Sequence, residues 1–150
     1  MNNCALRDVQ LIQLNMLLKV DEICRQNNIR YYLIGGSALG AVRHKGFIPW
    51  DEDIDIGMFR KYYDQFLDIA GKFLGNEYFL QTNRTDPHYH GPYAKLRANN
   101  TTFIENESKY LGAKVHQGIF IDIFPLDNVP DNELLLKLQL MLVRFLLTVA

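Results

Sequence analysis

The sequence predicts an α+β fold in which helices flank a mixed β-sheet, and two kinds of periodicity indicate it. Residues 8–27 carry apolar side chains at three- and four-residue intervals, which is typical of an amphipathic helix. Residues 53–58 instead alternate acidic and apolar side chains, the two-residue period of a strand. The 150 residues, 48% of them hydrophobic, suffice for one domain with its own core but not comfortably for two. We therefore expect a single domain over residues 1–150.

Turn residues define the unit between these two segments. Residues 31–34 are a short apolar and aromatic run that ends at Gly35–Gly36, so we expect a buried strand followed by a tight turn. Ser37 is expected to cap a short helix that runs through Arg43. A strand–turn–helix unit is thus predicted to precede the acidic strand.

Downstream of the acidic strand, residues 60–74 carry apolar side chains on one helical face, and Gly75 ends the expected helix. Short apolar runs then predict further strands over residues 78–81, 93–96, 101–105 and 118–124. Pro125 is expected to stop the last strand, because proline has no N–H group to donate to a sheet.

The last segment, residues 134–150, is almost wholly apolar and is expected to form a buried helix. It includes Lys137 and Arg144 and is shorter than the roughly 20 predominantly apolar residues that a membrane-spanning helix needs. A helix that is apolar nearly all round requires partners on several sides. The sequence therefore predicts that the domain is incomplete at its C-terminus, or that this helix packs on another subunit or on a membrane surface.

The bulk composition narrows the classes of function and location. The net charge of -1 argues against a general nucleic-acid binder, although a small nucleotide needs only a few local cations. Cys4 and Cys24 are expected to be free thiols, because roughly 30 Å of helix rise separates them. The N-terminus lacks the basic-then-apolar pattern of a signal peptide. We therefore expect a cytoplasmic protein.

Three aspartates dominate the most informative segment of the chain. On a strand, Asp51, Asp53 and Asp55 would point to one side, while Ile54 and Ile56 would point into the core. Neighbouring carboxylates would lie roughly 6.6 Å apart along that strand. Such close like charges raise each other's pKa and oppose folding unless a cation compensates them. Mg²⁺ and Mn²⁺ prefer oxygen ligands, so the pattern predicts a divalent cation site.

Two other readings of these acids are weaker. A solvated acidic loop accounts for the acids but not for the alternating isoleucines. An EF-hand calcium loop fits its first three ligands at Asp51, Asp53 and Asp55, but Ile56 occupies its glycine position and Tyr62 replaces its bidentate glutamate.

A distant carboxylate, Asp122, lies within the apolar strand predicted over residues 118–124. Burial of a lone aspartate costs several kcal/mol unless it is paired or bound to metal. A neutral or backbone-bonded Asp122 is the simpler reading of this residue alone. Beside Asp53 and Asp55, however, it would complete the carboxylate cluster, so we expect this strand to lie next to the acidic strand.

The glycine-rich turn and several cations are candidates for phosphate binding. The turn at Gly35, Gly36 and Ser37 would present backbone N–H groups at a helix N-terminus, which favours negative charge. It is not a Walker A loop, because no lysine follows Gly40. The candidate phosphate-binding cations are Arg43, Lys45, Lys95 and Arg97.

Together these motifs resemble the LicD family of the polymerase-beta-type nucleotidyltransferase superfamily. The resemblance is carried by residues 36–56, by the segment around Lys95 and Arg97 with Thr101–Thr102, and by residues 118–127, in that order. Phosphocholine transferases of bacterial surface glycans belong to this family, and fukutin-type sugar-phosphate transferases are its animal relatives. The resemblance implies a nucleotidyltransferase-like fold over about residues 20 to 130.

The resemblance also implies roles for the acids and the turn. Asp53 and Asp55 would hold Mg²⁺ or Mn²⁺, with Asp51 assisting. Asp122 would complete the metal site or take the proton of the acceptor hydroxyl, so that Asp53, Asp55 and Asp122 are the catalytic residues. Gly36 and Ser37 would hold the phosphates of the donor. The implied binding residues beyond the acids are Gly35, Gly36, Ser37, Arg43, Lys95 and Arg97.

The implied reaction is phosphotransfer from a CDP-alcohol, such as CDP-choline, to a hydroxyl of a cell-surface glycan such as lipopolysaccharide or teichoic acid. A glycan acceptor places the enzyme at the inner face of the membrane. Family members are typically longer than this chain, and their C-terminal half is absent here. Two alternatives therefore stand: a nucleotidyltransferase that moves NMP from an NTP to a small-molecule or protein hydroxyl, and an inactive, truncated binding module.

Overall fold

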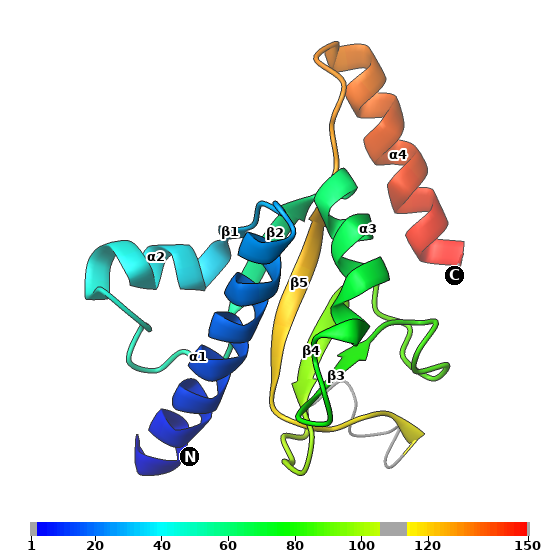
Figure 1. Cartoon of the computed structure of the whole chain (residues 1–150). Coiled ribbons are helices and arrows are strands. Elements are labelled where there is room, and N and C mark those ends of the chain that lie inside the picture. The colour runs from blue at the N-terminus through cyan, green and yellow to red at the C-terminus, as the bar shows by residue number, and fades with distance from the viewer. Residues whose placement is uncertain (1–2, 106–113, 150) are drawn as a thin grey trace.

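The computed structural model describes residues 3–105 and 114–149. Within these residues the helices are α1 (Asn3–Gln26), α2 (Gly35–His44), α3 (Arg60–Ile69) and α4 (Glu133–Val149), with a 3-10 turn, η1 (Ala70–Lys72), directly after α3. The strands are β1 (Tyr32–Leu33), β2 (Asp55–Phe59), β3 (Tyr78–Gln81), β4 (Ala94–Ala98) and β5 (Phe120–Leu126). Figure 1 shows their arrangement. The expected α+β class is confirmed.

The strands form one mixed five-stranded sheet in the order β1-β2-β5-β4-β3. β2 and β5 are parallel neighbours, and the other three neighbouring pairs are antiparallel. The strands β2 and β5, which carry Asp55 and Asp122, therefore lie side by side at the centre of the sheet, although β3 and β4 lie between them in the sequence. The predicted placement of residues 118–124 beside the acidic strand is confirmed.

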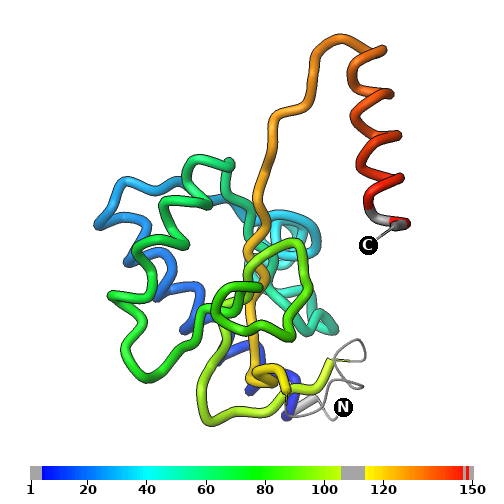
Figure 2. The backbone as a smooth tube through the Cα atoms, turned by 90° about the vertical axis from the view of Figure 1, so that its right-hand side faces the viewer, coloured from blue at the N-terminus to red at the C-terminus, as the bar shows by residue number. Residues whose placement is uncertain are grey.

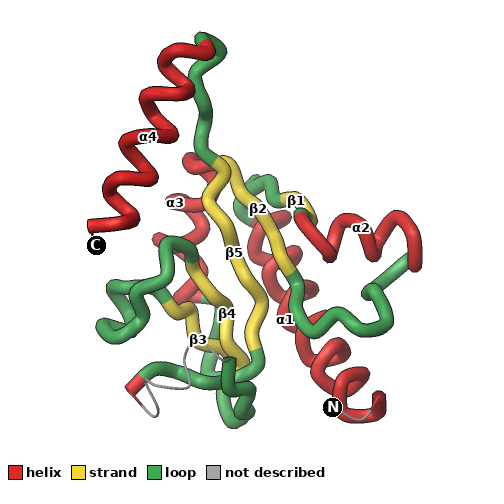
Figure 3. The backbone as a smooth tube through the Cα atoms, turned by 180° about the vertical axis from the view of Figure 1, so that it is seen from behind, coloured by secondary structure: helices red, strands yellow, loops and turns green. Residues whose placement is uncertain are grey.

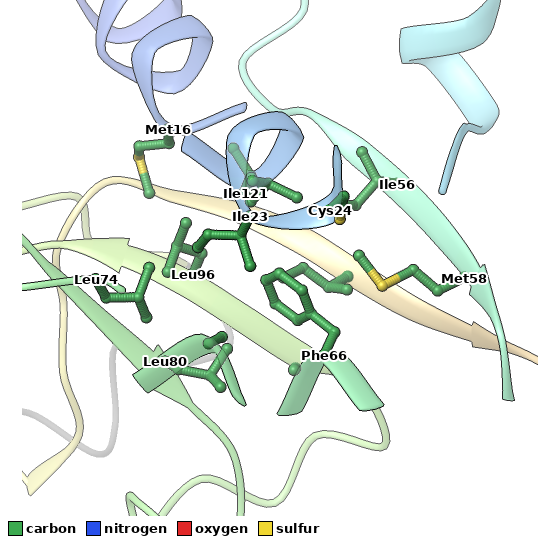
Figure 4. Close-up of a cluster of buried hydrophobic side chains, with 14 of the residues drawn as sticks. Met16, Ile23, Cys24, Ile56, Met58, Phe66, Leu74, Leu80, Leu96 and Ile121 are labelled. Carbon is green, nitrogen blue, oxygen red and sulfur yellow. The ribbon is translucent and has the colours of Figure 1, made fainter. Parts of the chain in front are cut away.

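Helices α1 and α3 cover one face of this sheet and enclose the core. In Figure 1 both helices lie in front of the strands, and in Figure 3, seen from behind, the strands lie in front of them. The α1 side chains Met16, Val20 and Ile23, spaced for one helical stripe, are at most 1% exposed. Figure 4 shows how Met16 and Ile23 meet the apolar side chains of the sheet and Phe66 of α3. The core residues contributed by the strands include Ile56, Met58, Leu80, Leu96, Ile121 and Ile123.

Two expectations for the glycine-rich turn are wrong. β1 is not a buried strand: it is the two-residue edge of the sheet, paired only with β2, and Tyr32 is 44% exposed. Ser37 does not cap α2, because the helix already begins at Gly35 with Ile34 as its N-cap residue and without a side-chain cap. The Ser37 hydroxyl instead accepts a hydrogen bond from the N–H of Asp55.

Two expectations for the later strands are also wrong. Residues 101–105 form a loop, because the Thr101 hydroxyl donates to Ala98 O at 2.7 Å and accepts from Ile119 N at 2.9 Å, which makes a turn after β4. Pro125 does not end β5 but lies within it, opposite Met58. Alternate residues of β5 direct their N–H groups to β2. The backbone nitrogen of Pro125 faces the other side, where the pairing with β4 extends only as far as Ile123. The missing N–H therefore removes no bond of the sheet.

Helix α4 stands apart from the rest of the molecule, and the expectation of a buried helix is wrong. Figure 2 shows it beyond an extended segment that continues from β5. Its described large apolar side chains other than the half-buried Leu136 are exposed, for example Leu134 at 67% and Phe145 at 62%. Over the described residues, no helix combines the length and the apolar character needed to cross a bilayer.

Candidate active site

Four polar side chains form one row across four neighbouring strands. The register pairs Gln81 with Lys95, Lys95 with Asp122, and Asp122 with Asp55. Side chains alternate between the two faces of a strand, so all four project from the face opposite α1 and α3. The parallel pairing of β2 with β5 thus brings two predicted catalytic carboxylates onto neighbouring strands.

The first turn of α2 lies directly against two of the acids. Gly35 has a φ of +53°, and a Cβ atom there would meet Asp55 Oδ2 at 3.1 Å. A Cβ atom on Gly36 would meet Asp51 Oδ2 at 2.7 Å, which is closer than real side chains approach. The two glycines therefore allow the helix N-terminus, which favours negative charge, to approach the carboxylates. The bond of 2.9 Å from Asp55 N to Ser37 Oγ fixes the start of β2 against this turn.

Close packing of like charges changes the ionisation of the acids at the start of β2. Burial, the charge of Asp53 and a hydrogen bond to it raise the pKa of Asp51. Burial and the charges of Asp53 and Asp51 raise the pKa of Asp55 to about 6, while Lys95 opposes the shift. This part of the site therefore holds its negative charge at an energetic cost, which a bound cation would reduce.

Asp122 is the most buried acid of the row. It is 6% exposed, and the Lys95 ammonium lies 2.8 Å from its Oδ1. Burial raises the pKa of Asp122 to about 6, against the lowering effect of Lys95, and the charges of Glu105 and Asp55 add to the rise. Lys95 is thus an internal counterion of the acidic row rather than an exposed cation.

Arg97 forms the second buried cationic centre on this face. Its side chain is 1% exposed and donates to Gln81 Oε1 at 2.6 Å, to Gly118 O at 2.9 Å and to Glu105 Oε2 at 2.6 Å. Lys95 also donates to Glu105, at 2.8 Å. Although burial opposes ionisation, these hydrogen bonds and charges lower the pKa of Glu105. The fold thus uses Arg97 to hold the loop after β4 to the sheet, and phosphate binding by Arg97 stays a prediction.

The structure separates the other two predicted phosphate-binding cations, Arg43 and Lys45, from the acids. Arg43 is exposed in the last turn of α2. Roughly 10 Å of helix rise separates it from the glycines at the other end of that helix. Lys45 follows with a left-handed backbone and is also exposed. The structure therefore does not bring Arg43 or Lys45 into the acidic row.

The described part of the chain contains no preformed metal site built by three or more side chains. Among residues 3–105 and 114–149, no three Asp, Glu, His or Cys side chains are grouped so that they could hold one metal ion. Asp51 instead bonds to Asp53, and Asp55 lies opposite Asp122 on the neighbouring strand, while the charges of Asp53 and Asp51 also act on Asp55. Metal ligation by Asp51, Asp53, Asp55 and Asp122 therefore stays a prediction.

A cavity of about 470 Å³ opens beside the row, and two tyrosines line it together with the buried ions. The Tyr89 hydroxyl donates to Tyr93 O at 2.9 Å, which closes the loop that forms one wall. The Tyr93 ring lies 4.3 Å, centroid to centroid, from the ring of Phe124 on β5. Space for a ligand of moderate size thus adjoins Lys95, the counterion of Asp122.

Two glutamines of α1 also contribute to the site, and the sequence reasoning missed them. Gln10 and Gln13 are 3% and 1% exposed and donate to backbone carbonyls of the segment that leads into β2. A signal existed, because Gln13 lies on the apolar stripe of the helix, three residues before Met16. Gln81 and Glu105 were missed as well, and an isolated Gln81 at the end of an apolar strand was the corresponding signal.

These features define an α+β protein that presents paired carboxylates on two parallel strands, beside the glycine-rich start of a helix. Residues 28–141 match the family described as "LicD/FKTN/FKRP, nucleotidyltransferase domain". The chain therefore belongs to the LicD family, and the predicted resemblance is confirmed.

Individual relatives agree with this assignment. The chain is 35% identical over 133 residues to "Lipopolysaccharide cholinephosphotransferase LicD" of Haemophilus influenzae, a match that covers 88% of this chain and 48% of that protein. It is 58% identical over 31 residues to "Ribitol 5-phosphate transferase FKRP" of Homo sapiens, which is 21% of this chain and 6% of that relative. The chain thus spans about half the length of the Haemophilus protein and a smaller part of the human one.

Proposed function

We propose that this chain carries the catalytic site of a metal-dependent phosphotransferase. It moves a phospho-alcohol group, phosphocholine in the first instance, from a CDP-alcohol to a hydroxyl of a cell-surface glycan such as lipopolysaccharide or teichoic acid. The main observation in support is that Asp55 lies opposite Asp122 on parallel strands, beside the first turn of α2. Membership of the LicD family and the name of the Haemophilus relative support the substrate class.

The chemistry of the donor set fits a hard cation. Asp53 and Asp55 offer only carboxylate oxygens, the ligands that Mg²⁺ and Mn²⁺ prefer, and Asp51 adds a third nearby. The raised pKa of Asp55 has burial and the charges of Asp53 and Asp51 as its causes, and a cation would offset these charges. We therefore assign Asp53 and Asp55 as the residues that would hold the ion. Bound there, the ion would neutralise phosphate charge and align the displacement.

The remaining residues supply binding and proton transfer. The acceptor hydroxyl oxygen forms a bond to the distal phosphorus of the donor, the bond from that phosphorus to its bridging oxygen breaks, and CMP leaves with the bonding electrons. Asp122 accepts the proton of the attacking hydroxyl, and Lys95, 2.8 Å from it, holds its carboxylate in place. The N–H groups of the first α2 turn favour the phosphates of the donor.

The direct test is release of CMP from CDP-choline, CDP-ribitol and CDP-glycerol, each with Mg²⁺ and with a glycan acceptor. We expect release from one of these donors, abolished by EDTA and restored by added Mg²⁺ or Mn²⁺. The family's human relative makes CDP-ribitol an informative second donor. Because the chain spans about half of its Haemophilus relative, the assay should also include that relative's full-length protein as a positive control.

The same assay separates the two alternatives. Pyrophosphate release from an NTP, with no CMP release from any CDP-alcohol, would identify a nucleotidyltransferase instead. Stabilisation by Mg²⁺ and a CDP-alcohol without turnover would identify a binding module. Thermal shift measures the second outcome, because a ligand that binds only the folded state raises its Tm.

A further inference from the structure

The aspartates at the entrance to β2 lie on a segment that the sheet itself does not hold. β2 begins at Asp55, so Asp51 and Asp53 precede the first ladder pair. Among the described backbone bonds, the bond from Asp51 N to Ile48 O closes a local turn, and the bond from Asp122 N to Ile54 O reaches the segment only at its end. Something other than strand pairing must therefore fix the backbone between them.

Two buried side chains of α1 provide this support. Gln13 Nε2 donates to Glu52 O at 2.7 Å and to Phe120 O at 3.1 Å. One amide group thus bonds a carbonyl between Asp51 and Asp53 and also a carbonyl two residues before Asp122. It links the segment before β2 to the first residue of β5, from the face of the sheet that α1 covers.

Gln10 supports the same segment one helical turn earlier. Its Nε2 donates to Asp51 O at 2.9 Å and lies 3.4 Å from Ile48 O. Arg7 Nη1 donates to Gln10 Oε1 at 3.1 Å and so fixes which way the amide faces. Apart from Arg7 of its own helix, Gln10 bonds only to the segment before β2, whereas Gln13 bonds both to that segment and to β5.

We propose that Gln13, assisted by Gln10, is a positioning residue that holds the backbone of Asp51 and Asp53 at a fixed distance from Asp122. Neither glutamine approaches the reacting groups, and both act through backbone carbonyls. The expected effect on the reaction rate rests on the proposed function, but the support of the backbone by the two glutamines does not. Preorganisation of this kind matters because a displacement of about 1 Å can lower a reaction rate by roughly 100-fold.

The first test is hydrogen exchange without metal or substrate, which does not depend on activity. Gln13→Met keeps the length of the side chain but removes its two donors. We expect exchange of the Asp55 and Asp122 amides to become about 10-fold faster, because both strand approaches lose an anchor. Gln10→Met should accelerate exchange before β2 and leave Asp122 unchanged.

Two variants of the same helix serve as controls. Val20→Ala removes a fully buried side chain and lowers stability without touching either strand approach. Gln26→Met removes an exposed glutamine whose amide bonds Glu22. If Gln13→Met accelerates exchange at Asp55 and Asp122 no more than Val20→Ala does at matched stability, the proposal is wrong. Should Gln13→Met not fold, Gln10→Met decides the question through the segment before β2.

The second test is kinetic. In CMP release we expect Gln13→Met to lower kcat about 10-fold with KM for the donor within about twofold, since the groups that bind the donor are retained. Val20→Ala at a temperature where it is folded should keep the kcat of the original chain. A wild-type chain that releases no CMP contradicts the proposed function, yet the exchange experiment still decides the role of Gln13. Equal kcat in Gln13→Met and wild type overturns the proposal.

Discussion

The two faces of the central strands differ in what they contribute. On β2 and β5, Ile56, Ile121 and Ile123 are completely buried against α1 and α3. The intervening residues Asp55 and Asp122 carry charge on the opposite face, where burial raises the pKa of each to about 6. One face stabilises the fold through apolar burial, and the other opposes it by holding carboxylates close together. The polar site therefore depends on the stability that apolar burial on the opposite face of the same strands supplies.

The largest expected effect comes from an acid on the polar face. Asp55→Asn should lower kcat for CMP release by about 1,000-fold, because electrostatic stabilisation of a phosphoryl-transfer transition state is commonly worth this much. The measurement is initial-rate kinetics with saturating Mg²⁺. Circular dichroism should show an unchanged fold. Retention of more than a tenth of the wild-type kcat would contradict a direct role for this carboxylate.

On the apolar face, Phe66→Ala should destabilise the protein by about 3–5 kcal/mol, because the side chain is fully buried in the core. Urea unfolding followed by circular dichroism measures this loss. Phe73→Ala, at a side chain that is 37% exposed, is the matched control and should cost clearly less. Similar losses at the two positions would show that Phe66 is no more deeply buried in the core than Phe73.

Lys95→Met tests the buried ion pairs that Lys95 forms with Asp122 and Glu105 on the polar face. The variant removes the Lys95 counterion from Asp122, whereas Glu105 keeps its ion pair with Arg97. Removal of one partner of a buried pair typically costs about 3–5 kcal/mol, and the second partner of Glu105 should keep the loss near the lower end. Urea unfolding at pH 7.5 gives the value. Lys72→Met, at an exposed lysine, should change stability little.

The smallest effect is a pH dependence of stability, measured without divalent cations. The pKa of Asp55 is raised from 3.8 to about 6 in the folded protein, so its contribution to stability is present below pH 4 and is lost as the pH rises to about 6. Asp55→Asn should therefore raise the Tm at pH 7.5 and have less effect on it at pH 4. Thermal unfolding at the two pH values checks this. A variant that is less stable than wild type at pH 7.5 would mean that burial and the charges of Asp53 and Asp51 do not raise the pKa of Asp55.

Several elements could be predicted because their signals are local. The stripe of Met16, Val20 and Ile23 follows helical spacing, and residues 78–81 are the predicted strand without change. The placement of Asp122 beside Asp55 was predicted from the energetic cost of burying a carboxylate without a partner. Edge position, however, is not local, so β1 was wrongly expected to be buried. The helix expected over residues 134–150 was also wrongly expected to be buried, because burial depends on contacts with other segments and is not a local property either.

The sequence by itself determined the candidate groups of the site: the carboxylates, their two-residue spacing and the glycines at the start of a helix. These are properties of neighbouring residues and need no knowledge of the fold. Only the tertiary structure decided which side chains neutralise or position the acids. Lys95, Glu105 and Gln13 come from distant segments, and their hydrogen bonds exist only after the sheet and α1 have packed. Long-range pairing of this kind leaves no signal that identifies the partner, even where a polar residue such as Gln13 on an apolar stripe indicates that a partner is needed.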